Sequence, residues 1–486
     1  MKKIVRQFDH EYLLFIVGIV ITLFNTVNMQ QNTVLLMSIP QYLLVFFFLF
    51  KKDYRTAFLL HMVFITACVS RGIVIDDVSP FLYIKFRVYG PLTFNIIVLT
   101  ILWISVQGKK ITVKKDSLLL ICRKTFLYLM ISGSLIGLVG CLFVHYNDWY
   151  QWFSSILFIS QILIIIDIYV HLYNESYSKL FALISICMMA AAPVASVVSF
   201  YVFGVQAYYG YEAMPLYNPI IALSPCLIIA FFQLQNLKLK TISMIGLVFY
   251  VFHSLILSRG SQFLDIFVVL LLLSYLVYFK KNTNFQIKGL KILLPALIFL
   301  VLPMAIGGVT NSSEISLKKF EQFTSLFTIF SFSDNRIALN FEEVGSSPYI
   351  RIGELANIIH EGVHNFLAFI FGKGYGGYYT DSLHFFDGID LSRGAFSDES
   401  AMSGRFYNAH SAIPSLLHYN GLLGLFLMLR LAFLYFRRVD KSFLVFAAFV
   451  LFVQTFYFDM FGCFSFVMAL FGAEYLMNNS SKNAVL

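Results

Sequence analysis

Residues 180–205 read LFALISICMMAAAPVASVVSFYVFGV, an apolar run without a single charged side chain. A helix needs about 20 mostly apolar residues to cross the roughly 30 Å hydrocarbon core of a bilayer. The rest of the chain repeats this pattern, since 59% of its 486 residues are hydrophobic and 13% are charged, against about 25% charged in an average soluble domain. The composition excludes a soluble, disordered or disulfide-rich secreted protein and predicts a polytopic membrane protein.

Outward from this run, the same criterion marks about 14 transmembrane segments, so we expect an all-α membrane bundle. The predicted spans lie near residues 12–30, 34–50, 56–70, 91–106, 125–146, 152–173, 180–205, 219–234, 242–258, 263–279, 292–309, 411–436, 442–458 and 460–477. Residues 1–309 form a bundle of about 11 spans, residues 310–410 one large loop, and residues 411–486 the C-terminal spans with a short tail.

The distribution of basic residues predicts the orientation. The N-terminus carries Lys2, Lys3 and Arg6 without a small-residue cleavage site after the first apolar run, which indicates a retained span with a cytoplasmic N-terminus. Most of the 35 lysines and arginines then fall in inner loops, as the positive-inside rule requires. The large loop lies outside and the C-terminus inside. The net charge of +9 reflects loops facing anionic lipid, so no nucleic-acid partner is expected.

The large loop holds most of the outer polar residues. Two amphipathic helices are expected in it, at residues 315–330 and 351–371, lying on the bundle or the membrane surface. The second ends in Phe371-Gly372-Lys373-Gly374-Tyr375-Gly376-Gly377, which formally matches a nucleotide-binding glycine pattern. Because no strand precedes it, we interpret it instead as a flexible turn that brings backbone close to a substrate.

The sequence His360-Glu361-Gly362-Val363-His364 is an HExxH pattern on the second amphipathic helix. Two imidazoles at that spacing share one face and hold zinc in metalloproteases, where the glutamate acts as base. A third ligand is not obvious, although Asp398 and Glu399 are candidates. The alternative is the polar face of a surface helix near sugars or headgroups. We favour that alternative and expect no metal or other cofactor.

Charged residues at span ends offer further chemistry. Arg259 sits in a short outer turn, and Arg405 and His410 lie just before the span at 411–436. A guanidinium suits phosphate and an imidazole suits proton transfer, but all three residues also fit an interfacial anchor. Asp167 and Asp265 fall inside spans and Arg430 near a span end, where such groups line a cavity or pair with each other.

Three stretches together resemble the O-antigen polymerase family and the related O-antigen ligases. They are LSRGSQFLDIFVVLLLLSYLVYFKK at 257–281, FGKGYGGYY at 371–379 and AHSAIPSLLHYNGLLGLF at 409–426. SDNRIALNF, with Arg336, is similar to the arginine segment that precedes the glycine stretch in the family. The resemblance covers roughly residues 250–435. Ser411 follows the histidine where ligases usually have asparagine, which favours the polymerase.

The resemblance implies a GT-C-like membrane glycosyltransferase that joins undecaprenyl-diphosphate-linked repeat units. Arginines at the outer interface can neutralise the departing diphosphate. Arg259, Arg405 and His410 are the expected catalytic residues, with His410 orienting or deprotonating the acceptor hydroxyl. The residues that the resemblance implies for substrate binding are Arg259, Arg336, Arg405, Lys373, Gly374 and Tyr375. The aromatic residues expected to stack on sugars are Tyr375, Tyr378, Tyr379, Phe385, Phe386 and Tyr407.

The expected partners are the lipid-linked donor and acceptor oligosaccharides, membrane lipid, a flippase and a chain-length regulator, in the inner membrane of a bacterium with the large loop in the periplasm. Three alternatives stay open. An O-antigen ligase would transfer the finished glycan to lipid A–core. A flippase fits the number of spans but gives no reason for the large loop. The third alternative is a membrane zinc protease acting through His360 and His364.

Overall fold

The computed structural model describes most of the chain up to residue 257 and much of residues 346–438. The described residues are 10–27, 34–68, 83, 87–89, 91–113, 117–144, 147–205, 207–209, 212–214, 219–234, 236–257, 269–270, 274–275, 278, 330–333, 336–339, 346–386, 396, 398–407, 409, 412–438 and 471. Four predicted spans, at 263–279, 292–309, 442–458 and 460–477, lie wholly or mostly outside these residues.

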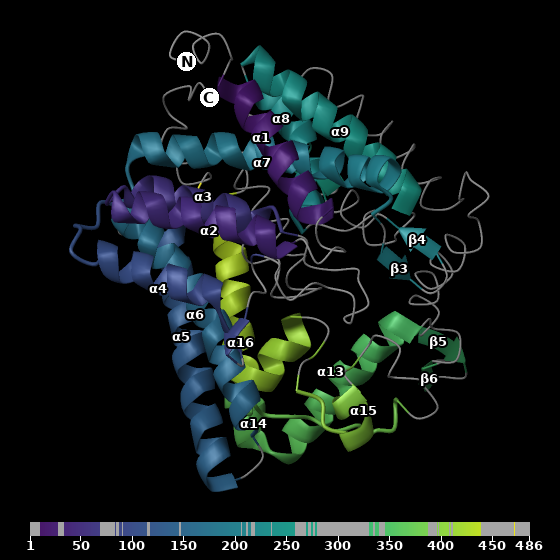
Figure 1. Cartoon of the computed structure of the whole chain (residues 1–486). Helices are drawn as coiled ribbons and strands as arrows, with labels where there is room; N and C mark the ends of the chain where they lie inside the picture. The colour runs from purple at the N-terminus through teal and green to yellow at the C-terminus, as the bar shows by residue number, and fades with distance from the viewer. Residues whose placement is uncertain are drawn as a thin grey trace.

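The described residues are mostly helical (Figure 1). The helices of the first half are α1 (His10–Val27), α2 (Val34–Phe50), α3 (Tyr54–Thr66), α4 (Phe94–Val106), α5 (Leu118–Val139), α6 (Trp149–Leu172), α7 (Glu175–Phe203), α8 (Leu227–Gln233) and α9 (Leu237–Leu257). A π-helical turn, Gly140–Val144, extends α5, and a 3-10 helix, Pro219–Cys226, precedes α8. The later helices are α13 (Ser346–His364), α14 (Phe366–Phe371), α15 (Asp398–Ser403) and α16 (Ala412–Phe436).

Three short antiparallel hairpins complete the described elements. They are β1 (Arg87–Tyr89) with β2 (Leu92–Thr93), β3 (Ala207–Tyr209) with β4 (Glu212–Met214), and β5 (Phe330–Ser333) with β6 (Arg336–Leu339). In the last hairpin Ser333 pairs with Arg336. The predicted amphipathic helix at 315–330 lies outside the described residues except for Phe330, which begins β5.

Five of the described helices are long and apolar enough to cross a membrane. They are His10–Val27, Leu118–Phe143, Trp149–Leu172, Glu175–Phe203 and Ile413–Phe436. Helices α2 and α4 are apolar but shorter. These helices agree with the prediction of an all-α, multi-pass membrane protein.

Helix α7 is the most buried of the five, and α1 and α9 pack along it. Small residues allow the close approach. A side chain at Gly18 of α1 would press on Ala191, and one at Gly246 of α9 would collide with Ala190. Helices in a membrane gain little from hydrophobic burial against one another, so small residues that bring backbones together favour their association.

A charged network ties α4, α5 and α6 together, as expected for an ionisable residue inside a span. Asp167 on α6 forms an ion pair with Arg123 on α5, with 2.6 Å between nitrogen and oxygen. Its carboxylate also accepts hydrogen bonds from Trp103 Nε1 at 2.6 Å and Gln107 Nε2 at 3.1 Å. Asp167 therefore has a basic partner, Arg123, that is not among the three residues considered from the sequence. Asp265 lies outside the described residues, and Arg430 is exposed on α16.

The segment around α13, α14 and α15 packs at the opposite end of this bundle (Figure 1). Arg123 and Asp167 lie near the start of α5 and the end of α6. The loop segment instead contacts the second half of α5, the residues before α6 and the first half of α16. The segment around α13 and α14 therefore lies near one end of α5 and α6, and the charged network lies near the other end.

Candidate functional site

Residues 372–377, here called the glycine strip, lie between α5 and α16 as non-helical backbone that includes a turn closed by a hydrogen bond from Gly377 N to Gly374 O at 3.2 Å. Lys373 N and Gly374 N donate hydrogen bonds to the carbonyls of His418 and Tyr419 at 2.7 and 3.1 Å, and Tyr375 N donates to Gly133 O at 2.9 Å. The two carbonyls of α16 are open to the strip because the helix leaves helical geometry at Gly421, where φ is 63° and ψ is −162°. The strip replaces the bonds that the kink removes.

The glycines of the strip allow close packing of protein on protein, which corrects the interpretation of a flexible turn facing a substrate. Gly374 is buried and has a φ of +73°, a conformation that favours glycine. A side chain there would collide with the backbone nitrogen of Gly137 on α5. Asn147 fixes the strip from the other side, with its amide donating to the carbonyls of Lys373 and Tyr375 at 3.0 Å each.

Tyr375 is also placed differently from the sequence prediction of a sugar-binding residue. Its ring is 1% exposed, and its hydroxyl donates a hydrogen bond to Leu129 O on α5 at 3.0 Å. Burial raises the pKa of this phenol, so it stays a neutral donor. Tyr379 and Phe386 are buried as well, and Tyr379 donates to Glu354 at 3.0 Å. Of the predicted stacking residues, Tyr378, Phe385 and Tyr407 keep partial exposure.

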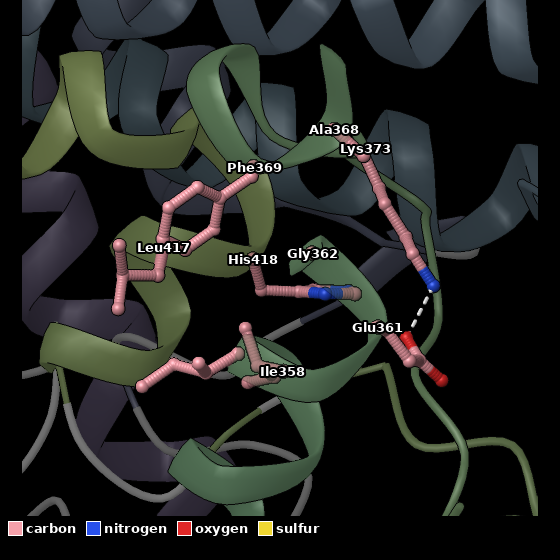
Figure 2. A pocket seen from close by; sticks show the side chains of 9 residues that line it. Ile358, Glu361, Gly362, Ala368, Phe369, Lys373, Leu417 and His418 are labelled. Atoms are coloured by element: carbon pink, nitrogen blue, oxygen red, sulfur yellow. Dashed lines mark hydrogen bonds and ion pairs between the residues drawn. The ribbon is translucent and has the colours of Figure 1, made fainter. Parts of the chain in front are cut away.

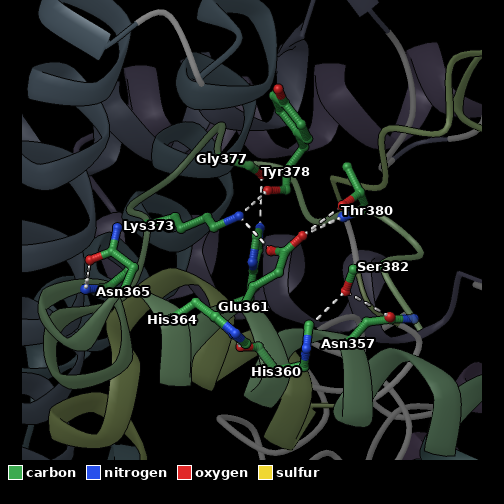
Figure 3. A network of polar contacts seen from close by, with 12 residues as sticks. Asn357, His360, Glu361, His364, Asn365, Lys373, Gly377, Tyr378, Thr380 and Ser382 are labelled. Carbon is green, nitrogen blue, oxygen red and sulfur yellow. Dashed lines mark hydrogen bonds and ion pairs between the residues drawn. The ribbon is translucent and has the colours of Figure 1, made fainter.

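Lys373 and Glu361 form the charged centre of the segment. Their side chains pair at 2.6 Å, and Lys373 Nζ also donates to Tyr378 O at 2.8 Å. The second carboxylate oxygen of Glu361 accepts from the backbone nitrogen and the hydroxyl of Thr380, each at 2.8 Å. Both carboxylate oxygens are therefore held in place, as Figure 3 shows.

A small recess opens beside this pair (Figure 2). Its walls come from the end of α13, from α14 and from the first turns of α16, and the lining residues are Ile358, Ile359, Glu361, Gly362, Ala368, Phe369, Lys373, Leu417 and His418. His418 is buried, with Nε2 at 2.9 Å from Gly377 O. The recess is thus apolar on one side and carries a lysine, a carboxylate and an imidazole on the other.

Arg405 joins Lys373 at the ring of Tyr378. The guanidinium lies 5.0 Å from the ring centroid, and Lys373 Nζ lies 5.9 Å from it. An antiparallel bridge brings the two segments together, since Tyr379 and Phe406 exchange backbone hydrogen bonds of 3.0 and 2.9 Å. Arg405 is exposed, and no carboxylate in the described part of the chain pairs with it. Two residues predicted to bind substrate therefore share one aromatic ring.

The HExxH residues do not form a protease centre within the described ranges. Glu361, the expected base, is turned toward Lys373 and Thr380. His360 and His364 share one side of α13, with ring centroids 4.5 Å apart. Among the described residues no third histidine, cysteine or carboxylate joins them as a ligand. Residues 351–371 are also not one helix, because α13 ends at His364 and Asn365 caps α14 by accepting from Ala368 N at 3.2 Å.

The remaining predicted residues are only partly placed. Arg259 and His410 lie outside the described residues, and Arg336 begins β6. The structure adds His418 and the ion-pair role of Glu361, which no sequence pattern indicated. Glu361 was considered only within the HExxH pattern. For His418 the available signal was its polar ring inside an apolar run next to Asn420.

The fold and the site define a class: a helical membrane protein with a polar, partly cationic site where residues 372–377 and the helices before them pack against α5 and α16. Comparison with known proteins does not assign the chain to a family within that class. No family model matches it, and neither a curated protein nor a solved structure does.

Proposed function

We propose that this protein is an integral-membrane glycosyltransferase that polymerises undecaprenyl-diphosphate-linked oligosaccharide repeat units at the outer face of a bacterial inner membrane. The large loop lies in the periplasm and both termini lie in the cytoplasm. The product is a polysaccharide of the O-antigen or capsule type. The resemblance of three ordered sequence stretches to O-antigen polymerases is the starting point of the proposal.

The observation that carries the proposal is the meeting of Arg405 and Lys373 at Tyr378. A diphosphate needs cations to hold it, and a sugar needs an aromatic ring to stack on. Arg405 offers an exposed fork of donors for phosphate oxygens. Tyr378 and Tyr407 form an edge-to-face pair beside it, with ring centroids 6.0 Å apart. The local chemistry therefore suits a sugar attached to a phosphate.

A lipid-linked substrate also needs an apolar surface for its prenyl chain. The residues that connect α13 to α14, here called the corner, provide one. Val363, Phe366 and Leu367 are 67%, 71% and 69% exposed there. Side chains of this kind insert at the boundary between headgroups and acyl chains. The corner directly follows Glu361 and precedes Lys373, so a prenyl chain lying against it would place its diphosphate near the cations.

In the proposed reaction the acceptor hydroxyl attacks the anomeric carbon of the donor while the bond from that carbon to the diphosphate oxygen breaks. Arg405 and Lys373, with Arg259 and Arg336 proposed from the sequence, stabilise the charge that develops on the leaving diphosphate. His410 accepts the proton of the attacking hydroxyl. The undecaprenyl diphosphate leaves with the electron pair of the broken bond.

Deletion of the gene tests the proposal in the host. A strain without the protein is expected to display surface glycan one repeat unit long, and the wild-type gene is expected to restore the polymer. Gel electrophoresis of surface glycan and mass spectrometry of the carrier lipid provide the measurement. Polymer that accumulates on the carrier and never reaches the surface would identify a ligase. Single repeat units retained on the cytoplasmic leaflet would identify a flippase, and either result contradicts the proposal.

A further inference from the structure

The two histidines at the end of α13 form a separate feature of the loop (Figure 3). His360 and His364 are one helical turn apart, and their ring centroids are separated by 4.5 Å. His360 is partly exposed and His364 is exposed. Two imidazoles at this spacing and on one face of a helix can bind one metal ion. A ring nitrogen can bind a metal ion only if it has a free lone pair, so the position of the proton on each ring decides which nitrogen is the ligand.

The tautomer of His364 follows from one hydrogen bond. Its Nδ1 lies 2.8 Å from the backbone carbonyl of His360. A carbonyl oxygen can only accept, so Nδ1 must carry the proton. The lone pair of the neutral ring is then on Nε2. Histidines that bind metals usually donate their second ring nitrogen to a backbone carbonyl in this way.

The tautomer of His360 follows from a longer chain of donors and acceptors that begins at Asp381. The carboxylate of Asp381 accepts from Asn357 Nδ2 at 2.7 Å, which fixes the orientation of that amide. Asn357 Oδ1 therefore faces Leu383 N at 2.9 Å and the Ser382 hydroxyl at 3.3 Å. Because Ser382 donates its proton to Asn357, its oxygen is the acceptor for His360 Nδ1 at 3.1 Å. His360 also keeps its lone pair on Nε2.

We propose that His360 and His364 form a reversible binding site for a divalent transition-metal cation of the zinc, nickel or copper class. The two Nε2 atoms are the protein ligands and water fills the other positions. Neutral imidazole is a preferred ligand for these ions. Glu361 lies between the two histidines in sequence but is held by Lys373 and Thr380, so it does not complete the site. This proposal is independent of the proposed glycosyltransferase activity.

The test is a calorimetric titration of the purified, tag-free full-length protein in detergent with zinc or nickel chloride alone. One ion is expected to bind and to be removed by a chelator. Binding is expected to be lost in His360→Ala and in His364→Ala, and to weaken about tenfold in Ser382→Ala, which removes the partner that orients His360. His10→Ala is the matched control, because His10 is an exposed histidine at the start of α1 and its loss should leave binding unchanged.

Copper provides a second measurement. The electron paramagnetic resonance spectrum of the copper-loaded protein is expected to show coordination by two imidazoles, reduced to one in either single variant. Melting curves of the metal-free variants confirm that each still folds. Absence of binding to the wild type, or binding that persists in both histidine variants, would overturn the proposal. A metal that resists the chelator would also overturn it, because such retention requires more than two protein ligands.

Discussion

Replacement of Gly374 by alanine is expected to destabilise the folded protein by about 3 kcal/mol. The residue has a φ of +73°, and its new side chain would collide with Gly137 on α5. A left-handed conformation costs roughly 1–2 kcal/mol for a residue with a side chain, and overpacking adds roughly 1–3 kcal/mol. The strip would separate from α5 and α16, so Lys373 would lose its position. Thermal unfolding of the purified protein in detergent measures the effect.

Gly204 provides the matched control for this substitution. It ends α7 with a φ of +66°, but nothing lies within 4 Å of the position that a side chain would take. Gly204→Ala should therefore carry only the cost of the backbone conformation, about 1 kcal/mol. If Gly374→Ala and Gly204→Ala lower the melting temperature equally, the close packing of the strip on α5 does not contribute to stability.

Replacement of Arg405 by alanine is expected to reduce the rate of glycan polymerisation roughly 100-fold, the loss typical when a group that stabilises a developing charge is removed. The side chain is exposed, so the variant should fold like the wild type. Arg405→Lys keeps the charge but loses the planar fork, and it should recover only part of the rate. The rate of the proposed reaction is measured with the purified protein and lipid-linked repeat units.

Arg437 is the matched control for Arg405. It is also an exposed arginine against an aromatic ring, with its guanidinium 5.8 Å from the centroid of Phe433, but it follows the opposite end of α16. Arg437→Ala should leave the polymerisation rate unchanged. Equal losses in the two variants would mean that general charge on the protein, and not the position of Arg405, affects the reaction.

Apolar runs predicted the positions of the described helices well, and charged residues limited the accuracy of their ends. The run at 34–50 coincides with α2. The run at 125–146, by contrast, begins seven residues later than α5, which starts at Leu118 after the Ser117 cap. Arg123 and Lys124 interrupt the hydropathy there. Arg123 can lie within α5 because it pairs with Asp167 on α6. Hydropathy alone cannot predict this contact between two helices.

The site depends more heavily on contacts between distant residues. Lys373 and Arg405 were predicted separately, and only the bridge between Tyr379 and Phe406 brings them to one ring. The burial of Tyr375 could not be predicted either, because the space for its ring comes from the absent side chain of Gly133 on another helix. The break at Asn365 had a local signal. Asparagine is a favoured N-cap, and it interrupts an otherwise continuous helical pattern.

The central claim is that the cations gathered at Tyr378 hold a prenyl diphosphate while a glycosidic bond forms. The most direct test is incubation of the purified wild-type protein with its native lipid-linked repeat units, followed by mass spectrometry of the lipid fraction. We expect carrier-linked glycans of two or more repeats, with one undecaprenyl diphosphate released for each bond formed. Unchanged single repeat units, in a preparation that demonstrably binds them, would contradict the claim.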